Sequence, residues 1–165
     1  MKKILIGILL VAIVGIQFIP RQHNNISALE NASIDKTHYV PDTVLTALKT
    51  SCYDCHSNQS NYPWYSFVQP VSIWINDHID EGKEELNFSE FGKYSLRRQF
   101  HKLEEISEQI ETDEMPLASY TLIHRNTVLS NPQKTAIKVW VKSLRDSFQN
   151  NYPVDSLKRK KRPVK

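Results

Sequence analysis

The pentapeptide of Cys52, Tyr53, Asp54, Cys55 and His56 carries the clearest chemical signature in the chain. Two cysteines that are separated by two residues and followed at once by histidine form the attachment pattern of a c-type haem. The two thiols can add to the vinyl groups of the haem, and the adjacent imidazole can bind the iron as its proximal ligand. Because the chain has 2 cysteines and both lie here, the pattern predicts one covalent haem c attached through Cys52 and Cys55, with His56 on the iron.

Two other kinds of site also use a C-x-x-C pair. A structural zinc site needs four ligands, usually with a second Cys or His pair at similar spacing, and the sequence has no second pair. A thioredoxin-like redox pair belongs to a βαβ context, whereas this chain has helical periodicity. Haem attachment is the favoured interpretation, with zinc binding and thiol redox chemistry as the alternatives.

Met115 is the expected distal iron ligand. Apart from Met1 it is the only methionine, and Pro116 directly after it restrains the local turn. A thioether favours ferrous iron, so ligation by histidine and methionine raises the reduction potential. His78 is the alternative distal ligand, and bis-histidine ligation lowers the potential. The structural interpretations are a methionine that fills a gap in the core and a hydrogen-bonded core histidine.

The elements that position these residues are predicted to be helices. The chain has 4 glycines, and its apolar residues recur at intervals of three and four, which is typical of helices with one buried face. The expected helices run from Asp42 to the cysteines, from Pro70 with an apolar stripe up to Ile79, over residues 95–111, over a short turn at 119–124, and from Pro132 to Phe148. The fold class is therefore all-α, with four or five helices around one cofactor.

The N-terminus indicates export. Two lysines precede an apolar run over residues 4–19, and no Ala-x-Ala site or lipobox cysteine follows it. We therefore expect residues 1–20 to form an uncleaved signal anchor helix, with a removed signal peptide as the alternative. A 16-residue helix is about 24 Å long, and lysines that reach the headgroups could bridge the difference from a hydrocarbon core of about 30 Å. The haem domain would then face the periplasm from the bacterial inner membrane, or be soluble there after cleavage.

The distribution of charge defines the remaining boundaries. Residues 22–157 hold all 18 acidic residues but 12 of the 21 basic ones, so this acidic part is not expected to bind nucleic acid. Residues 21–40 are predicted to be a linker, 41–148 the haem-binding domain, and 149–165 a basic disordered tail. Four side chains are candidates for binding the haem propionates, namely Trp64, Tyr65, Arg97 and Arg98.

The order of motifs resembles the bacterial haem-binding domain family of small exported c-type cytochromes over residues 41–148. The resemblance rests on Cys52–Asn58, Tyr62–Ser66, Pro70, Trp74, Asp77–His78, Leu86–Ser89, Met115–Pro116, Tyr120, His124 and Trp140. It implies a cytochrome-c-like helical fold and covalent haem c. By position, it makes Cys52 and Cys55 the attachment sites, His56 the proximal ligand and Met115 the distal ligand.

The sequence thus predicts a monohaem cytochrome that transfers electrons to and from redox partner proteins outside the cytoplasm, and not an enzyme. The alternative is a haem enzyme or sensor module whose sixth iron position is open or displaceable. The sequence has a single haem motif and no attached signalling domain, which favours the electron carrier.

Overall fold

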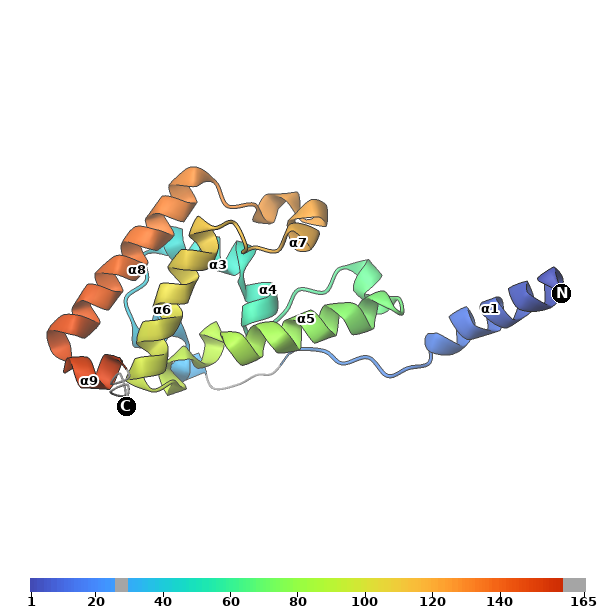
Figure 1. Cartoon of the computed structure of the whole chain (residues 1–165), viewed down its shortest axis with the longest axis horizontal. Helices are drawn as coiled ribbons and strands as arrows, with labels where there is room; N and C mark the ends of the chain where they lie inside the picture. Colours follow the sequence, from blue (N-terminus) through green and yellow to red (C-terminus); the bar gives the residue numbers. More distant parts are fainter. Residues whose placement is uncertain (26–29, 159–165) are drawn as a thin grey trace, which may run out of the picture.

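The computed structural model describes residues 1–25 and 30–158, and this part of the chain is helical with one isolated β-bridge between Asn25 and Gln59. Its α-helices, drawn in Figure 1, are α1 (Lys2–Ile16), α2 (Ile34–Thr37), α3 (Asp42–Ser51), α4 (Tyr53–His56), α5 (Val71–Glu85), α6 (Leu96–Glu111), α7 (Ala118–Ile123), α8 (Asn131–Asn151) and α9 (Val154–Leu157). Short 3₁₀ segments lie at Glu30–Ala32, Trp64–Phe67, Phe88–Lys93 and Arg125–Thr127. The predicted all-α class is confirmed.

The hydrophobic core lies between α6 and α8, with α3 packed against α8 and α9 against α6. Apolar residues spaced at helical intervals face one another across this contact, namely Phe100, Leu103, Ile106 and Ile110 from α6 and Ile137, Trp140, Val141 and Phe148 from α8. The helix starts follow from capping: the Ser95 hydroxyl accepts the Arg98 N–H, and the Ser130 N–H donates to Gln133 Oε1 at 2.8 Å. The apolar contacts between α6 and α8 confirm that each of these predicted helices has one buried face.

The expected linker over residues 21–40 is in large part folded. Asn24 is buried, Ile34 is fully enclosed in the core, and Val40 is also buried. The ring of His38 packs edge-on against Phe91, and its Nε2 lies 3.0 Å from Gln99 Oε1. The linker prediction was wrong here because isolated apolar residues in a polar segment give no periodic signal, yet each fills a gap between distant helices.

The tail boundary predicted at residue 149 also differs from the structure. Helix α8 continues to Asn151, and α9 follows it after a short turn. Leu157 of α9 is buried in the core, and Arg97 donates from Nη2 to the Asp155 carbonyl at 2.9 Å. Residues 149–157 are thus mainly helical and attached to the domain through Leu157, while the basic residues from 159 onward lie outside the described part of the chain.

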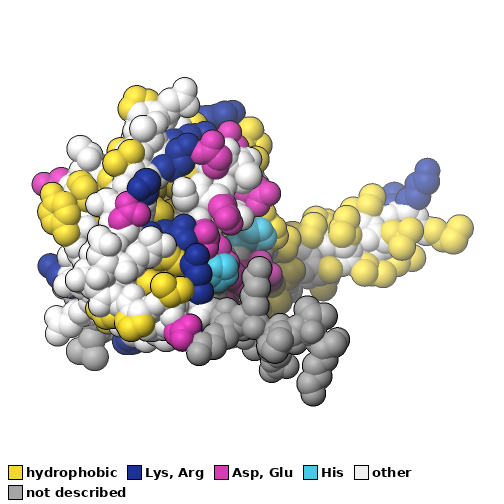
Figure 2. Space-filling view, turned by 60° about the vertical axis from the view of Figure 1, so that its left-hand side comes forward, with side chains coloured by type: hydrophobic (Ala, Val, Ile, Leu, Met, Phe, Trp, Pro, Cys, Tyr) yellow, Lys and Arg dark blue, Asp and Glu magenta, His cyan; other side chains and the backbone are white. Residues whose placement is uncertain are grey.

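Helix α1 projects away from the rest of the molecule (Figure 1). It buries none of its residues against the chain, and Figure 2 shows it as a mainly hydrophobic rod with lysines at its free end. The helix predicted for this segment is confirmed. The expected membrane span is not: α1 has 15 residues, and none of the helices described here combines the length and apolar character needed to cross a bilayer.

Candidate functional site

The cysteine-histidine motif lies on α4, a single helical turn that follows α3 with Cys52 at the junction. The His56 N–H donates to the Cys52 carbonyl at 2.9 Å, so the two ends of the motif close on each other. Cys52, Cys55 and His56 all line one cavity of about 300 Å³. Both cysteines are free and partly buried, so two thiols and one imidazole are presented to the same space.

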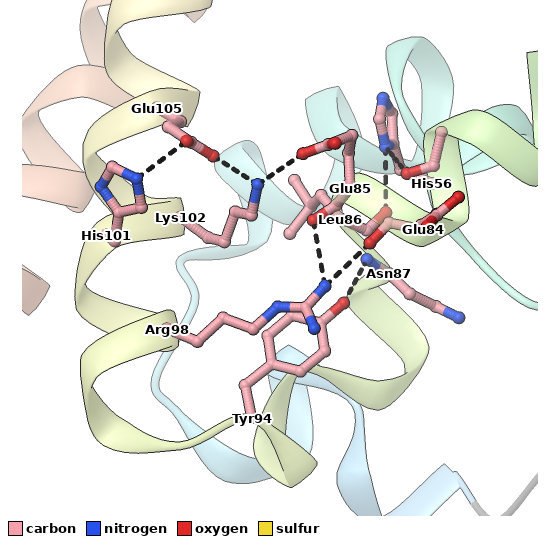
Figure 3. A network of polar contacts seen from close by, with 11 residues as sticks. His56, Glu84, Glu85, Leu86, Asn87, Tyr94, Arg98, His101, Lys102 and Glu105 are labelled. Carbon is pink, nitrogen blue, oxygen red and sulfur yellow. Dashed lines mark hydrogen bonds and ion pairs between the residues drawn. The ribbon is translucent and has the colours of Figure 1, made fainter.

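The hydrogen bonds of His56 fix which ring nitrogen is available to a metal. Nδ1 lies 2.8 Å from the Gly82 carbonyl oxygen and 2.9 Å from that of Leu86 (Figure 3). Carbonyl oxygens only accept, so Nδ1 carries the proton and Nε2 keeps its lone pair. Burial also lowers the pKa of His56, which favours the neutral imidazole that binds metals. A backbone carbonyl that holds the second nitrogen is the usual support for a ligating histidine.

Gly82 allows α5 to approach α4 closely. A Cβ atom at this position would lie 2.9 Å from the Cys55 carbonyl oxygen, a backbone atom that cannot swing aside. The glycine therefore permits the contact that brings its own carbonyl to His56. No local pattern indicated this role in the sequence.

The surroundings of the cysteines argue against thiol redox chemistry. Burial raises the pKa of Cys52 to about 12, with Cys55 as a second cause, and burial together with Asp54 raises the pKa of Cys55 to about 11. Reactive redox cysteines have lowered pKa values, because the thiolate is the nucleophile. The described residues also contain no cluster of three or more His, Cys, Asp or Glu that could hold a metal ion, so a zinc site of protein ligands alone has no support.

Met115, the predicted distal ligand, lines the same space as His56. A second cavity of about 420 Å³ adjoins the first, and the two share Cys52, His56, Glu85 and Met115. The inner faces of α3 and α6 supply its apolar wall, with Leu48, Ile106 and Ile110. Two adjoining cavities in this size range suit a large, flat cofactor. The residues present thus fit a haem: two thiols, an imidazole with a free nitrogen, a thioether and an apolar wall.

The end of α6 directs the chain to Met115. Asp113 adopts a left-handed conformation with φ of 59°, and the Glu114 N–H donates to the Gln109 carbonyl at 3.1 Å. This pattern ends a helix and reverses the chain. Two residues later, Met115 faces both cavities.

Helix α7, which follows Met115, is tied to the haem motif by a side-chain hydrogen bond. The Tyr120 hydroxyl donates to Asp54 Oδ2 at 2.6 Å, and Asp54 lies between the two cysteines. Tyr120 also stacks on His124, whose ring is hydrogen-bonded to the Tyr65 hydroxyl. Since α7 buries none of its residues, these polar contacts hold the Met115 loop near α4.

His78, the alternative ligand, lines the smaller of the two cavities but not the one walled by α6. Its ring packs at a tilt against Trp74, with the ring centroids 4.4 Å apart, and its Nδ1 lies 2.9 Å from the Trp74 carbonyl oxygen. Its Nε2 is therefore chemically able to bind a metal. The apolar stripe predicted for α5 is buried only at Ile79, whereas Trp74 and Val71 are exposed.

The four residues suggested for the propionates do not line either cavity. Arg98 instead donates to the Glu84 carbonyl at the end of α5, and Tyr65 contacts a neighbouring small cavity. The cation that does line the larger cavity is Lys102, which bonds Glu85 at 2.8 Å and Glu105 at 2.6 Å (Figure 3). Sequence reasoning missed Lys102 because it occupies a buried position among core residues of α6, where lysine is rarely found.

A buried polar cluster supports the motif from the opposite side. Asn24 donates from Nδ2 to the Ser57 carbonyl and to Ser60 Oγ, both at 2.8 Å, and its Oδ1 accepts from Lys83 at 2.7 Å. Farther along, Asn87 donates to Asn58 Oδ1 at 2.7 Å. These contacts join segments distant in sequence, so only the folded chain reveals them.

Comparisons with known proteins identify a family for this chain. The model of the haem-binding domain family matches residues 11–143, which is most of the chain. No curated protein and no solved structure matches the chain. The cavity, its free imidazole nitrogen and this match lead to one conclusion: the chain belongs to the haem-binding domain family.

Proposed function

We propose that this chain is a monohaem c-type cytochrome that carries electrons outside the cytoplasm. In this proposal Cys52 and Cys55 hold the haem, each by adding its S–H across one vinyl C=C bond, so that no oxidant is needed. His56 binds the iron through Nε2. When bound, the haem supplies a one-electron couple between ferric and ferrous iron.

The observation that carries the proposal is the fixed orientation of His56. Two backbone carbonyls hold Nδ1 as a donor, and the same imidazole lies one residue after Cys55 on the wall of the cavity. A structural or redox cysteine pair has no need of such an oriented imidazole. Covalent attachment next to an oriented ligand is what the C-x-x-C-H pattern provides.

Met115 is the distal ligand in this proposal, because it lines both cavities with His56 while His78 lines one. Met115 and His56 would together hold the iron, and the haem would supply one-electron chemistry. With both side chains bound, the iron would have no open site for a substrate, so electron transfer is favoured over an enzymatic role. The expected partners are redox proteins that dock on the surface.

We place the haem domain on the periplasmic side of a bacterial inner membrane, with α1 as the segment that directs export and associates with the bilayer. The support is the basic start of the chain and the apolar surface that α1 exposes along its length. Covalent haem attachment outside the cytoplasm agrees with export. The alternative, a soluble periplasmic protein after cleavage, shares the same haem domain.

The test is spectroscopy of the haem-loaded protein beside Met115→Ala, with His78→Ala as the matched control. Wild type is expected to show the thioether-to-iron charge-transfer band of the ferric state and a ferrous form that does not bind carbon monoxide. Met115→Ala loses the band and has a lower reduction potential, while His78→Ala keeps both properties. A band lost only in His78→Ala would reassign the distal ligand, and rapid carbon monoxide binding by wild type would favour the enzyme or sensor.

A further inference from the structure

The end of α1 is attached directly to the start of α5. Gln17, the residue that follows α1, donates from Nε2 to the Gln69 carbonyl at 3.1 Å, and its Oε1 accepts the Gln69 N–H at 3.0 Å. Gln69 and Pro70 precede α5, so this reciprocal pair joins the apolar helix to the end of α5 that points toward it (Figure 1).

The chain after α1 is held at further points. The His23 ring packs against Tyr62 at 5.3 Å and against Phe67 at 5.7 Å. The Asn24 N–H then donates to the Tyr62 hydroxyl at 2.8 Å, and its side chain enters the buried polar cluster beside α4. The end of α1 and the segment that follows it are therefore attached to the rest of the molecule at several points.

The segment that contacts the end of α1 contains no charged residue. Residues 61–76 contain no Asp, Glu, Lys, Arg or His, and neither do residues 4–20. Residues 61–76 belong to an uncharged stretch over residues 57–76, which together with residues 4–20 makes the two longest such stretches in the chain. The two stretches meet at Gln17 and Gln69. Within residues 61–76 the exposed apolar side chains, 36% to 79% accessible, form what we call the apolar tip: Trp64, Phe67, Val68, Val71, Ile73 and Trp74.

A lipid bilayer fits this combined surface. Helix α1 is exposed, and after Lys2 and Lys3 it contains only apolar residues and glycine, so an apolar solvent is the surrounding that buries this part fully. Its 15 residues span about 22 Å, less than a hydrocarbon core of about 30 Å. When α1 lies in the core, the apolar tip that is attached to its end is therefore brought close to the headgroups. The apolar tip carries two exposed tryptophans, Trp64 and Trp74, a residue type enriched at membrane interfaces.

We propose that the apolar tip docks on the same bilayer that takes up α1, so that the haem cavity is held in one orientation relative to the membrane. This inference rests on the membrane association of α1 proposed above. The tip lies against the headgroups and α6 and α8 lie farther away. A redox partner protein would then meet the haem domain in one orientation. A domain on a flexible tether would instead present all orientations to its partner.

The test is photo-cross-linking of the full, haem-loaded chain in phosphatidylcholine vesicles, with benzoylphenylalanine placed at one position at a time. Val68 reports on the tip, Val11 on α1, and Val139, which is 63% exposed on α8, is the matched control. An unchanged haem spectrum verifies that each variant folds. We expect lipid adducts at Val11 and Val68, several-fold above the yield at Val139.

The outcomes separate the two proposals. Adducts at Val11 without adducts at Val68 overturn the docking of the tip and leave the association of α1 intact. No adducts at either position overturn both. Cross-links from Val68 to a second copy of the chain, or equal lipid yields at Val68 and Val139, also overturn the docking.

Discussion

The two halves of the haem domain are held together in different ways. The half made of α6 and α8 buries large apolar side chains, and Phe100, Leu103 and Ile137 are almost completely enclosed. In the half made of α4, α5 and α7, α4 and α7 bury no residue and α5 buries Ser72 and Ile79. Burial of apolar surface within the polypeptide therefore stabilises the first half far more than the second.

Polar contacts position the second half. Tyr120 bonds Asp54, His56 bonds the α5 backbone, and Asn24 bonds Ser57. Such contacts give specificity but each adds only about 1 kcal/mol of net stability. The larger cavity has walls from both halves, and a haem there would add the apolar surface that the chain lacks. We therefore expect the bound cofactor to complete the fold of the half that binds it.

The largest effect is expected from removing both attachment points. In Cys52→Ala/Cys55→Ala, backbone amides of α5 and α7 should exchange rapidly with solvent, while those of α6 and α8 stay protected. Without attached haem, the second half has too little buried apolar surface to resist local opening. Hydrogen exchange against the haem-loaded wild type measures this, and equal protection of the two halves in the variant would contradict the comparison.

The next effect concerns the apolar half. Leu103→Ala removes a fully enclosed side chain and should lower the free energy of unfolding by about 3 kcal/mol. The haem spectrum should not change, because Leu103 lines neither cavity. Denaturant titration gives the energy, and Val139→Ala on the exposed face of α8 is the control, with an expected change within about 0.5 kcal/mol. A loss as small as that of the control would show that this core is loosely packed.

The close contact between the α4 and α5 backbones tests how the half made of α4, α5 and α7 is held together. Gly82→Ala places a methyl group against the Cys55 carbonyl, which should cost about 2 kcal/mol and disturb the His56 ligation. Denaturant titration and the haem spectrum report on the two effects. Gly15→Ala is the matched control, since a Cβ there meets nothing within 4 Å. If the two variants behave alike, the close approach of α4 and α5 is not needed.

The smallest effect is a dependence of stability on pH that comes from His38, which contacts Gln99 of α6 and Phe148 of α8 in the apolar half. Burial lowers the pKa of His38 from 6.5, and the side chain of Gln99 opposes this shift. The unfolded chain therefore takes up a proton before the folded one, so stability is present above pH 6.5 and declines as the pH falls through this value. His38→Gln should flatten the decline in unfolding curves of the haem-loaded protein. An unchanged slope would assign the decline to other groups.

Sequence reasoning found the parts of this molecule that repeat or that carry rare chemistry. The apolar spacing of α6 and α8 is a local signal. The haem motif is equally local, because its three functional residues lie within five positions. For the same reason the family resemblance stated from these motifs agrees with the family match.

The remainder depends on contacts between distant segments. Asn24 and Ile34 lie in a polar stretch, yet one supports the haem motif and the other fills the core. Lys102, and neither of the suggested arginines, lines the larger cavity. Arg98 instead donates a hydrogen bond to the Glu84 carbonyl at the end of α5. The roles of such residues follow from where the fold places them, which their neighbours in sequence do not indicate.

The most direct test of the central claim is the mass of the protein matured in a host that has haem-ligation machinery. We expect the intact mass to increase by one haem, and the fragment containing Cys52 and Cys55 to carry the whole increase. An unmodified mass, with both thiols open to alkylation, would contradict covalent attachment and with it the proposed role of this chain as a c-type cytochrome.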